Sequence, residues 1–153
     1  MSMLKVYLHF VWATKNRTPY LLNKETREVV WDHIFLNGKQ KGINILIANG
    51  HKDHCHCLLQ MGKDQTLSQL AQLMKGESSF WINKNQILPA DNHLGKFDWQ
   101  DDYYVESVSP SHIYSVFDYI QTQDIHHEEI SFEEEYQKFL TEYDIRNLLL
   151  KKD

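Results

Sequence analysis

Apolar and polar residues alternate with two different periods along the chain. A period of two, which is typical of strands, runs through residues 4–14, 43–49, 53–61 and 102–109. Apolar residues at helical spacing separate the first strand from the second and the third from the fourth. The buried positions expected in these two helices are Val29, Val30, Ile34 and Phe35, then Leu67, Leu70, Leu73 and Met74. This order predicts an α+β fold, the ferredoxin-like β-α-β-β-α-β antiparallel sheet.

Capping and turn residues set the expected boundaries of these elements. Asn23 is a good N-cap for the first helix, which should end near Gly42. Thr66 and Gln69 have the spacing of a capping box at the start of the second helix. The turn at residues 50–53 predicts a hairpin with a loop of about four residues. The first strand is apolar on both faces, so we expect it to be central.

An added helix should follow the fourth strand. Ser109 is a suitable N-cap, and Pro110 occupies the first helical position. The expected core stripe of this helix is Ile113, Val116, Phe117 and Ile120. Tyr119 and Gln123 are four residues apart and therefore share another side of the helix.

Two features interrupt the regular pattern. Gly76 lies inside the second helix, where glycine costs about 1 kcal/mol against alanine, so it suggests close approach by another backbone or a ligand. Residues 85–101 contain Pro89, Asn92, Gly95 and two Asp-rich turns and predict an irregular surface segment.

The charge of the chain is concentrated at its C-terminal end. Residues 1–123 hold 12 Lys+Arg and 12 Asp+Glu, a net charge of 0, whereas residues 124–153 hold 4 and 9, a net charge of −5. We expect a domain over residues 1–123 and an acidic, aromatic tail over 124–153 that packs on the domain or on a dimer partner. A neutral domain predicts modest, salt-sensitive binding to nucleic acid rather than non-specific coating.

The first residues lack the features of a signal peptide, and no apolar run reaches membrane-spanning length. We therefore expect a cytoplasmic protein with no membrane partner. Cys55 and Cys57, two residues apart on one strand, are poor disulfide partners, which fits a reducing compartment.

The strand at residues 53–61 carries the strongest chemical signal. Successive side chains point to opposite faces, so His54 and His56 share one face and Cys55 and Cys57 the other. The histidines can converge on one ion, or they are simply hydrogen-bonded residues of a sheet surface. A zinc site using all four side chains is disfavoured, because structural zinc ligands normally come from two separate pairs.

Two imidazoles and one amide oxygen leave open positions on a divalent ion, which can then act as a Lewis acid on a phosphoryl group. A tyrosine phenolate can attack phosphorus and form a covalent intermediate, with a sugar 3′-hydroxyl as leaving group. The phenol pKa of about 10 means that the tyrosine needs the field of the metal and a base or water.

The residues that carry this chemistry resemble a known family. Residues 54–56 resemble the His-hydrophobic-His (HUH) motif, and residues 119–123 resemble the Tyr-Ile-x-x-Gln motif of single-tyrosine HUH transposases. These include transposase A of the smallest bacterial insertion sequences and the REP-associated tyrosine transposases. The resemblance covers most of the chain. Similar segments occur at His9, residues 14–17, Asp53, residues 75–79, Trp99 and residues 103–108.

The resemblance implies that Tyr119 is the nucleophile, forming a 5′-phosphotyrosine link and freeing a 3′-hydroxyl. It implies that His54, His56 and Gln123 bind Mg²⁺ or Mn²⁺. Members of the family cut and rejoin single-stranded DNA, recognise imperfect hairpins near the ends of the element and form homodimers. In these dimers the tyrosine helix typically packs against the histidine strand of the partner.

Three cationic residues are candidate DNA contacts. Lys15 and Arg17 lie in a basic turn, which is either a phosphate-contacting segment or a solvated loop. Lys75 begins the segment that resembles the family at residues 75–79. His126 or His127, one turn beyond Gln123, could replace or supplement it as a metal ligand.

Two other functions remain open on sequence grounds. A non-catalytic or domesticated hairpin-binding protein could stack bases on sheet tyrosines, with Tyr7, Tyr103 and Tyr104 as candidates. Such a module has no need for Tyr119 and Gln123 one turn apart. A rolling-circle initiator or relaxase would share the chemistry, but those chains are usually larger.

Overall fold

The computed structural model describes residues 2–89 and 93–123, together with Glu134 and Gln137. Residues 1–123 form one compact unit. The strands are β1 (Tyr7–Ala13), β2 (Asn44–His51), β3 (His54–Gln60) and β4 (Tyr104–Val108). The helices are α1 (Lys24–Gln40), α2 (Leu67–Ala71), α3 (Glu77–Lys84) and α4 (Ile113–Gln121). A π-helical turn (Gln72–Gly76) joins α2 to α3, and 3₁₀ turns cover Lys15–Arg17 and Pro110–His112.

The four strands form one sheet in the order β2-β3-β1-β4, with every neighbouring pair antiparallel. The predicted ferredoxin-like fold with an added C-terminal helix is therefore confirmed, and β1 is central as expected. The β2–β3 hairpin is also confirmed, but its predicted loop of four residues is wrong. His51 pairs with His54, so only Lys52 and Asp53 form the loop.

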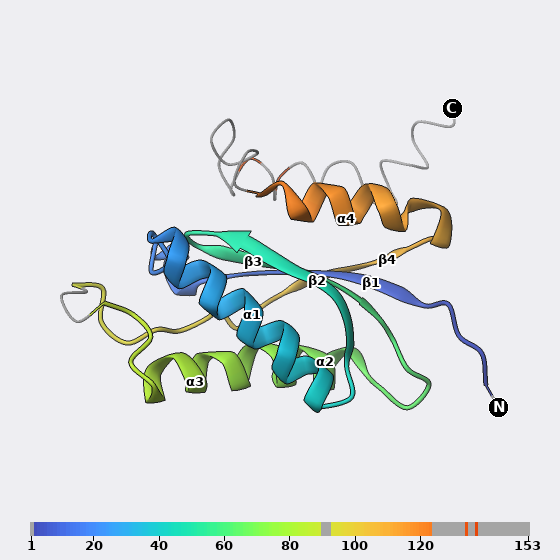
Figure 1. Cartoon of the computed structure of the whole chain (residues 1–153), viewed down its shortest axis with the longest axis horizontal. Helices are drawn as coiled ribbons and strands as arrows, with labels where there is room; N and C mark the ends of the chain where they lie inside the picture. The colour runs from blue at the N-terminus through green and yellow to red at the C-terminus, as the bar shows by residue number, and fades with distance from the viewer. Residues whose placement is uncertain (1, 90–92, 124–133, 135–136, 138–153) are drawn as a thin grey trace. The chain divides into compact units, whose positions relative to one another are not determined.

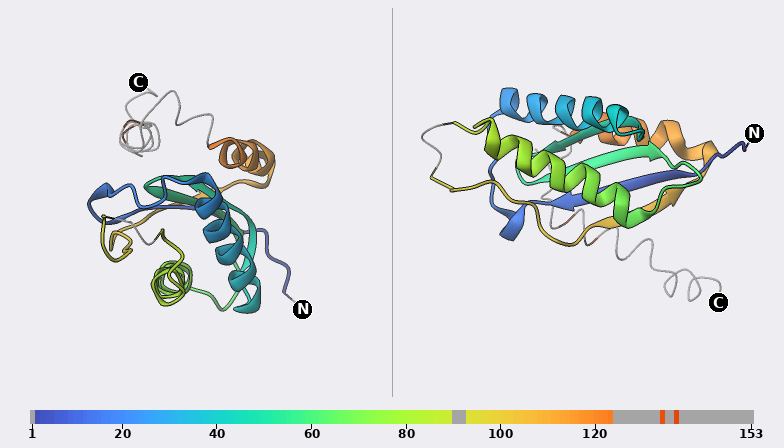
Figure 2. Two further views of the ribbon diagram at one scale, coloured as in Figure 1. Left: turned by 60° about the vertical axis from the view of Figure 1, so that its left-hand side comes forward. Right: turned by 90° about the horizontal axis from the view of Figure 1, so that it is seen from below.

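Helices cover both faces of the sheet. Helices α1 and α3 lie on one face and α4 lies on the other (Figure 1; Figure 2). The larger core includes Phe10, Trp12, Ile34, Cys55 and Leu59. The smaller core, under α4, joins Leu58, Val108 and Ile120. Within the part of the chain that the structure describes, no helix has both the length and the apolar character to cross a bilayer.

Hydrogen bonds confirm the predicted starts of the first two helices, whereas the predicted start of the added helix at Pro110 is wrong. The side-chain oxygen of Asn23 accepts from the backbone N–H groups of Glu25 and Thr26 at 2.8 and 3.2 Å. Thr66 and Gln69 form the predicted reciprocal capping box. After Ser109 the chain first makes a 3₁₀ turn, and α4 begins only at Ile113.

Some predicted core positions are wrong. The side chains of Val29, Leu67 and Leu73 are 47%, 40% and 37% exposed. Each helix buries only the side that faces the sheet, so the apolar residues at the margin of each stripe remain in water. Trp31, which the predicted stripe omitted, is buried at 5% exposure.

The segment between α3 and β4 is irregular as predicted, but it is not all surface. Phe97 and Trp99 are buried, so that part of the prediction is wrong. The side chain of Asn83 accepts from the N–H of Phe97 at 2.9 Å and donates to its carbonyl at 2.9 Å. The indole N–H of Trp99 donates to Oγ of Ser78 at 2.9 Å. These bonds fasten the segment to α3.

Two glycines differ sharply in the space around them. A Cβ on Gly50 would collide with the carbonyl oxygen of His54, which belongs to the backbone of the paired strand. A Cβ on Gly76 would meet no atom of the described residues within 4 Å. The predicted close approach of another backbone to Gly76 is therefore wrong.

We expect Gly50→Ala to destabilise the domain by about 3 kcal/mol, because the backbone of β3 must shift to accept the methyl group. Gly76→Ala is the matched control and should be neutral or stabilising by about 1 kcal/mol, since Gly76 has helical φ and ψ of −63° and −44°. Urea unfolding of both variants measures the difference. Equal stabilities would contradict the close packing of β2 on β3.

Candidate active site

The two motif histidines occupy the face of β3 that α4 covers. His54 and His56 are both 0% exposed. Cys55 and Cys57 point to the opposite face and belong to the larger core, as the predicted alternation requires. Burial raises the pKa of both thiols, and their position on the opposite face keeps them from converging with the histidines on one ion. The candidate metal ligands on β3 are therefore its two histidines.

His54 lies between a carboxylate and an amide. Its Nδ1 donates to Oδ1 of Asp53 at 2.9 Å, and its Nε2 lies 3.2 Å from Oε1 of Gln123. The amide nitrogen of Gln123 donates to the carbonyl of Tyr119 at 3.2 Å, and this bond turns the amide oxygen toward His54. Gln123 lies two residues beyond the end of α4 and is itself fully buried.

This arrangement suits a cation. With the proton on Nδ1, the lone pair of Nε2 faces the lone pairs of the Gln123 oxygen. Two acceptors at that distance need either a second proton on the imidazole or a positive ion that both can bind. Imidazole nitrogen and amide oxygen are both ordinary ligands for divalent metals. The residues present therefore fit the ion that the family resemblance implies.

His56 lies at the end of a series of polar side chains that runs from Tyr104 through Glu106 and His9. Its Nδ1 is 2.9 Å from Nε2 of His9 on β1, and the two rings stack with centroids 5.1 Å apart. Nδ1 of His9 lies 3.5 Å from Oε1 of Glu106, its directly paired neighbour on β4. The hydroxyl of Tyr104 donates to Oε2 of the same carboxylate at 3.0 Å.

Tyr119 meets His56 from α4. The two rings are edge-to-face, with centroids 5.8 Å apart and planes at 83°. The side-chain amide of Asn49 on β2 donates to the carbonyls of Ile120 and Gln121 at 2.9 and 3.2 Å. Because Asn49 satisfies these terminal carbonyls, it also fixes the end of α4 over the sheet. One chain thus brings Tyr119 beside its own histidines.

The basic turn adjoins this site. The backbone N–H of Thr14 donates to the carbonyl of Asp53 at 2.8 Å, which places the turn beside His54. Lys15 is exposed and lies 3.7 Å from a carboxylate oxygen of Asp98, and Arg17 is partly buried. The turn that holds Lys15 and Arg17 therefore adjoins the histidine strand, and the role of these two residues in DNA binding stays a prediction.

Lys75 lies elsewhere, in the π-helical turn on the other face of the sheet. It is 8% exposed, and its ammonium donates to the carbonyls of Asp101 and Asp102 at 2.7 and 3.2 Å. Burial lowers the pKa of Lys75, and Asp101, Asp102 and Asp98 oppose that shift. The contacts of Lys75 hold the segment before β4, and its role in DNA binding stays a prediction.

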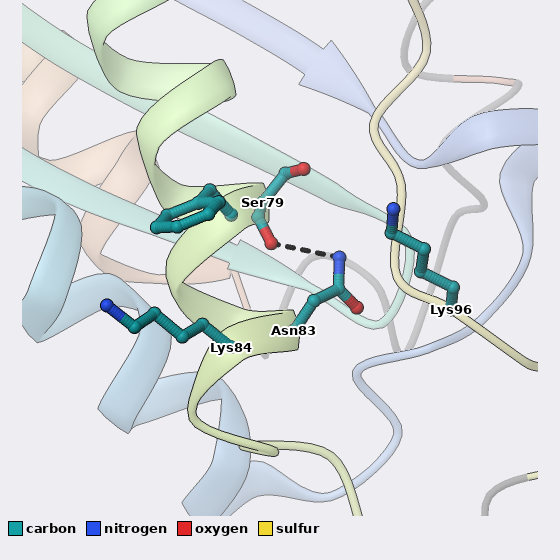
Figure 3. Close-up of a pocket in the computed structure, with 5 residues that line it drawn as sticks. Ser79, Asn83, Lys84 and Lys96 are labelled. Carbon is teal, nitrogen blue, oxygen red and sulfur yellow. Dashed lines mark hydrogen bonds between the residues drawn. The ribbon is translucent and has the colours of Figure 1, made fainter.

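A cavity of about 410 Å³ lies on α3, away from the histidines (Figure 3). Figure 3 shows Ser79, Asn83, Lys84 and Lys96 around it, and the fifth lining residue is Phe80. None of the residues named for cleavage lines this cavity, so the candidate chemistry belongs to the α4 face.

Sequence patterns missed Asn49, Tyr104 and Glu106 as parts of the site. The alternation of each strand gives the face on which such a residue lies, but not its partner on the neighbouring strand. Among the described residues, no three His, Cys, Asp or Glu side chains are grouped as a metal site. The candidate set instead contains two imidazoles and an amide. His126 and His127, the alternative ligands, and the predicted tail lie outside the described residues.

Comparison with known proteins concerns the fold and the family of the chain. No curated protein matches the chain. A presumed transposase from Deinococcus radiodurans R1 is similar in structure, with a TM-score of 0.58, 24% identity, and coverage of 80% of this chain and 95% of that chain. A REP-associated tyrosine transposase solved with a REP hairpin also has a TM-score of 0.58, with 17% identity, 85% of this chain and 76% of that chain covered.

These two likenesses concern the fold. The family itself comes from the sequence, since residues 2–123 match the model of the IS200-like transposases. That range contains both motif histidines, Tyr119 and Gln123, so the resemblance expected from the motifs is confirmed. The chain therefore belongs to the IS200-like transposase family.

Proposed function

We propose that this transposase cleaves and rejoins single-stranded DNA through a covalent 5′-phosphotyrosine at Tyr119. A divalent cation, Mg²⁺ or Mn²⁺, would be held by His54, His56 and Gln123. The observation that carries the proposal is the meeting of α4 with β3. The ring of Tyr119 lies against His56, while Gln123, one turn later, faces His54.

The cleavage step conserves the phosphodiester energy. Oη of Tyr119 loses its proton and attacks phosphorus, and the bond from phosphorus to the 3′-oxygen breaks. The 3′-oxygen takes a proton and leaves as a hydroxyl, while the 5′ side remains esterified to the tyrosine. A 3′-hydroxyl can later attack this ester and reverse the exchange, so rejoining needs no ATP.

In this scheme, residues of the chain orient the side chains that would bind the cation. Asp53 and His9 hold the rings of His54 and His56, and the carbonyl of Tyr119 holds the amide of Gln123. When bound, the cation supplies Lewis-acid polarisation of the phosphoryl oxygen and favours the phenolate.

The site must open to receive DNA. His54, His56 and Gln123 are each 0% exposed, and Tyr119 is half-buried. A phosphodiester can therefore reach the histidines only if some of the contacts that cover them open. The bonds from the side-chain amide of Asn49 to the end of α4 lie beside the site and are candidates for such an opening.

The proposed substrate is single-stranded DNA that folds into a hairpin. The structurally similar REP-associated transposase was solved bound to a REP hairpin, which supports this class of ligand. The turn that holds Lys15 and Arg17 adjoins the site and offers the positive charge that phosphates require. A homodimer, implied by the family resemblance, is likewise proposed, although the tyrosine and histidines already meet within one chain.

The test is to incubate the protein with single-stranded hairpin oligonucleotides from its own genomic flanks, with and without Mn²⁺. Denaturing gels and peptide mass analysis then look for a DNA adduct. We expect a metal-dependent adduct on Tyr119. If hairpins bind and no adduct forms with any metal, a non-catalytic or domesticated hairpin-binding protein becomes the better assignment.

The positions of the three candidate stacking tyrosines weigh against a non-catalytic hairpin-binding protein. Tyr7 and Tyr104 lie on the α4 face, whereas Tyr103 packs against the larger core, with its ring centroid 5.6 Å from that of Phe10. The three rings therefore do not form one stacking surface.

A further inference from the structure

We propose that Glu106 is a positioning residue, which acts through His9 to fix the tautomer and the orientation of His56. In this role it keeps the Nε2 lone pair of His56 available to the cation. The inference rests on the metal site of the proposed function, but it concerns residues that no motif named for that role.

Glu106 holds a fixed position beside His9. Oε2 of Glu106 accepts from the hydroxyl of Tyr104 at 3.0 Å, and this bond fixes the carboxylate plane. Nδ1 of His9 lies 3.5 Å from Oε1, and because a carboxylate can only accept, this neighbour favours the tautomer of His9 that carries its proton on Nδ1. Glu106 is about one-fifth exposed and His9 is 2% exposed, so water competes weakly for the contact.

The tautomer of His9 determines which nitrogen of His56 carries the proton. A neutral imidazole with its proton on Nδ1 has a lone pair on Nε2. Nε2 of His9 lies 2.9 Å from Nδ1 of His56, and one of these two nitrogens must donate to the other. Since Nε2 of His9 is the acceptor, Nδ1 of His56 is the donor.

Nε2 of His56 is the nitrogen that would bind the cation. With its proton on Nδ1, His56 presents a lone pair at Nε2, which is a buried atom. Protonation at Nδ1 is the tautomer that imidazole favours less in water, so the protein has to enforce it. Hydrogen bonds of this kind orient metal-binding histidines generally, and their loss lowers metal affinity by about 10–100-fold.

His54 and His56 thus receive their tautomers from different carboxylates. Asp53 accepts directly from His54, being its neighbour in sequence. Glu106 is on the far side of β1 and acts through the intervening His9. Both arrangements leave Nε2 as the atom for the ion, so the two rings can bind one cation together.

The first test uses the metal-free protein and needs no variant. Long-range ¹⁵N–¹H correlation spectra, recorded where the imidazoles are neutral, assign the protonated nitrogen of each ring. We expect Nδ1–H at both His9 and His56. Protonation of His56 at Nε2 would overturn the proposal, whatever the outcome of the DNA adduct assay.

The second test removes the carboxylate. In Glu106→Ala, His9 can take the other tautomer and donate from Nε2, which makes Nδ1 of His56 the acceptor and puts a proton on its Nε2. We expect this proton shift in the spectra and Mn²⁺ binding weaker by about 10–100-fold, measured by titration without DNA. Glu106→Gln should largely restore both, because its amide oxygen can accept from His9.

The control is Ser107→Ala, the exposed neighbour of Glu106 on the opposite face of β4. It should change neither the tautomers nor the Mn²⁺ affinity. Unchanged tautomers and affinity in a folded Glu106→Ala would contradict the positioning role. If Glu106→Ala does not fold, Tyr104→Phe replaces it and should weaken Mn²⁺ binding in the same direction by a smaller factor, and no weakening would count against the proposal.

Discussion

Tyr119→Phe is expected to abolish formation of the DNA adduct, lowering cleavage by at least about 10³-fold, while hairpin binding is unchanged. The substitution removes only Oη, the atom that bonds to phosphorus in the proposed reaction. The ring contact with His56 is edge-to-face and half-buried, and a phenylalanine ring preserves it. Denaturing gels with Mn²⁺ measure the adduct, and gel shifts in its absence measure binding.

The matched control is Tyr114→Phe. Tyr114 belongs to the same helix but is 83% exposed, so its hydroxyl should not affect cleavage. An adduct that persists in Tyr119→Phe would refute the assignment of the nucleophile. Peptide mass analysis would then show whether Tyr104, whose hydroxyl bonds to Glu106 on the same face, or another residue carries the DNA.

The sequence was sufficient to predict the fold because its signals are local. The period-two runs placed four strands, and Asn23 and Thr66 form the caps that their residue types favour. The hairpin loop length was wrong because alternation gives the strands but not where pairing stops. The burial of Phe97 and Trp99 was missed because an irregular segment has no period from which burial can be inferred.

The site was predictable only where its residues lie close together in sequence. His54 and His56 share a face by alternation, and Tyr119 and Gln123 share one by helical spacing. Contact between these two pairs within one chain depends on how α4 packs on its own β3, which the periodicities do not give. The family resemblance implied packing on the histidine strand of the partner. Glu106 belongs to the site through strand register, since it pairs with His9 across 97 residues of sequence.

His54→Ala is expected to remove metal binding almost completely. The wild-type protein should gain about 2.7 kcal/mol of stability at a Mn²⁺ concentration of 100 Kd, because the ion binds only the folded state. Without His54, the amide oxygen of Gln123 loses the imidazole that faces it at 3.2 Å, and two ligands remain. Thermal unfolding with and without Mn²⁺ measures the gain. His112→Ala, which changes an exposed histidine before α4, should keep it.

Gln123→Ala separates the possible third ligands. If the amide oxygen binds the ion, this variant should weaken Mn²⁺ binding by about 10-fold, and Gln123→Glu, which retains an oxygen at the same position, should not. An unchanged affinity in Gln123→Ala would instead favour His126 or His127. A full Mn²⁺ response in His54→Ala would contradict the metal site as a whole, because Nε2 of His54 is the ligand that the buried Gln123 faces. Tyr119 would then need another source of activation.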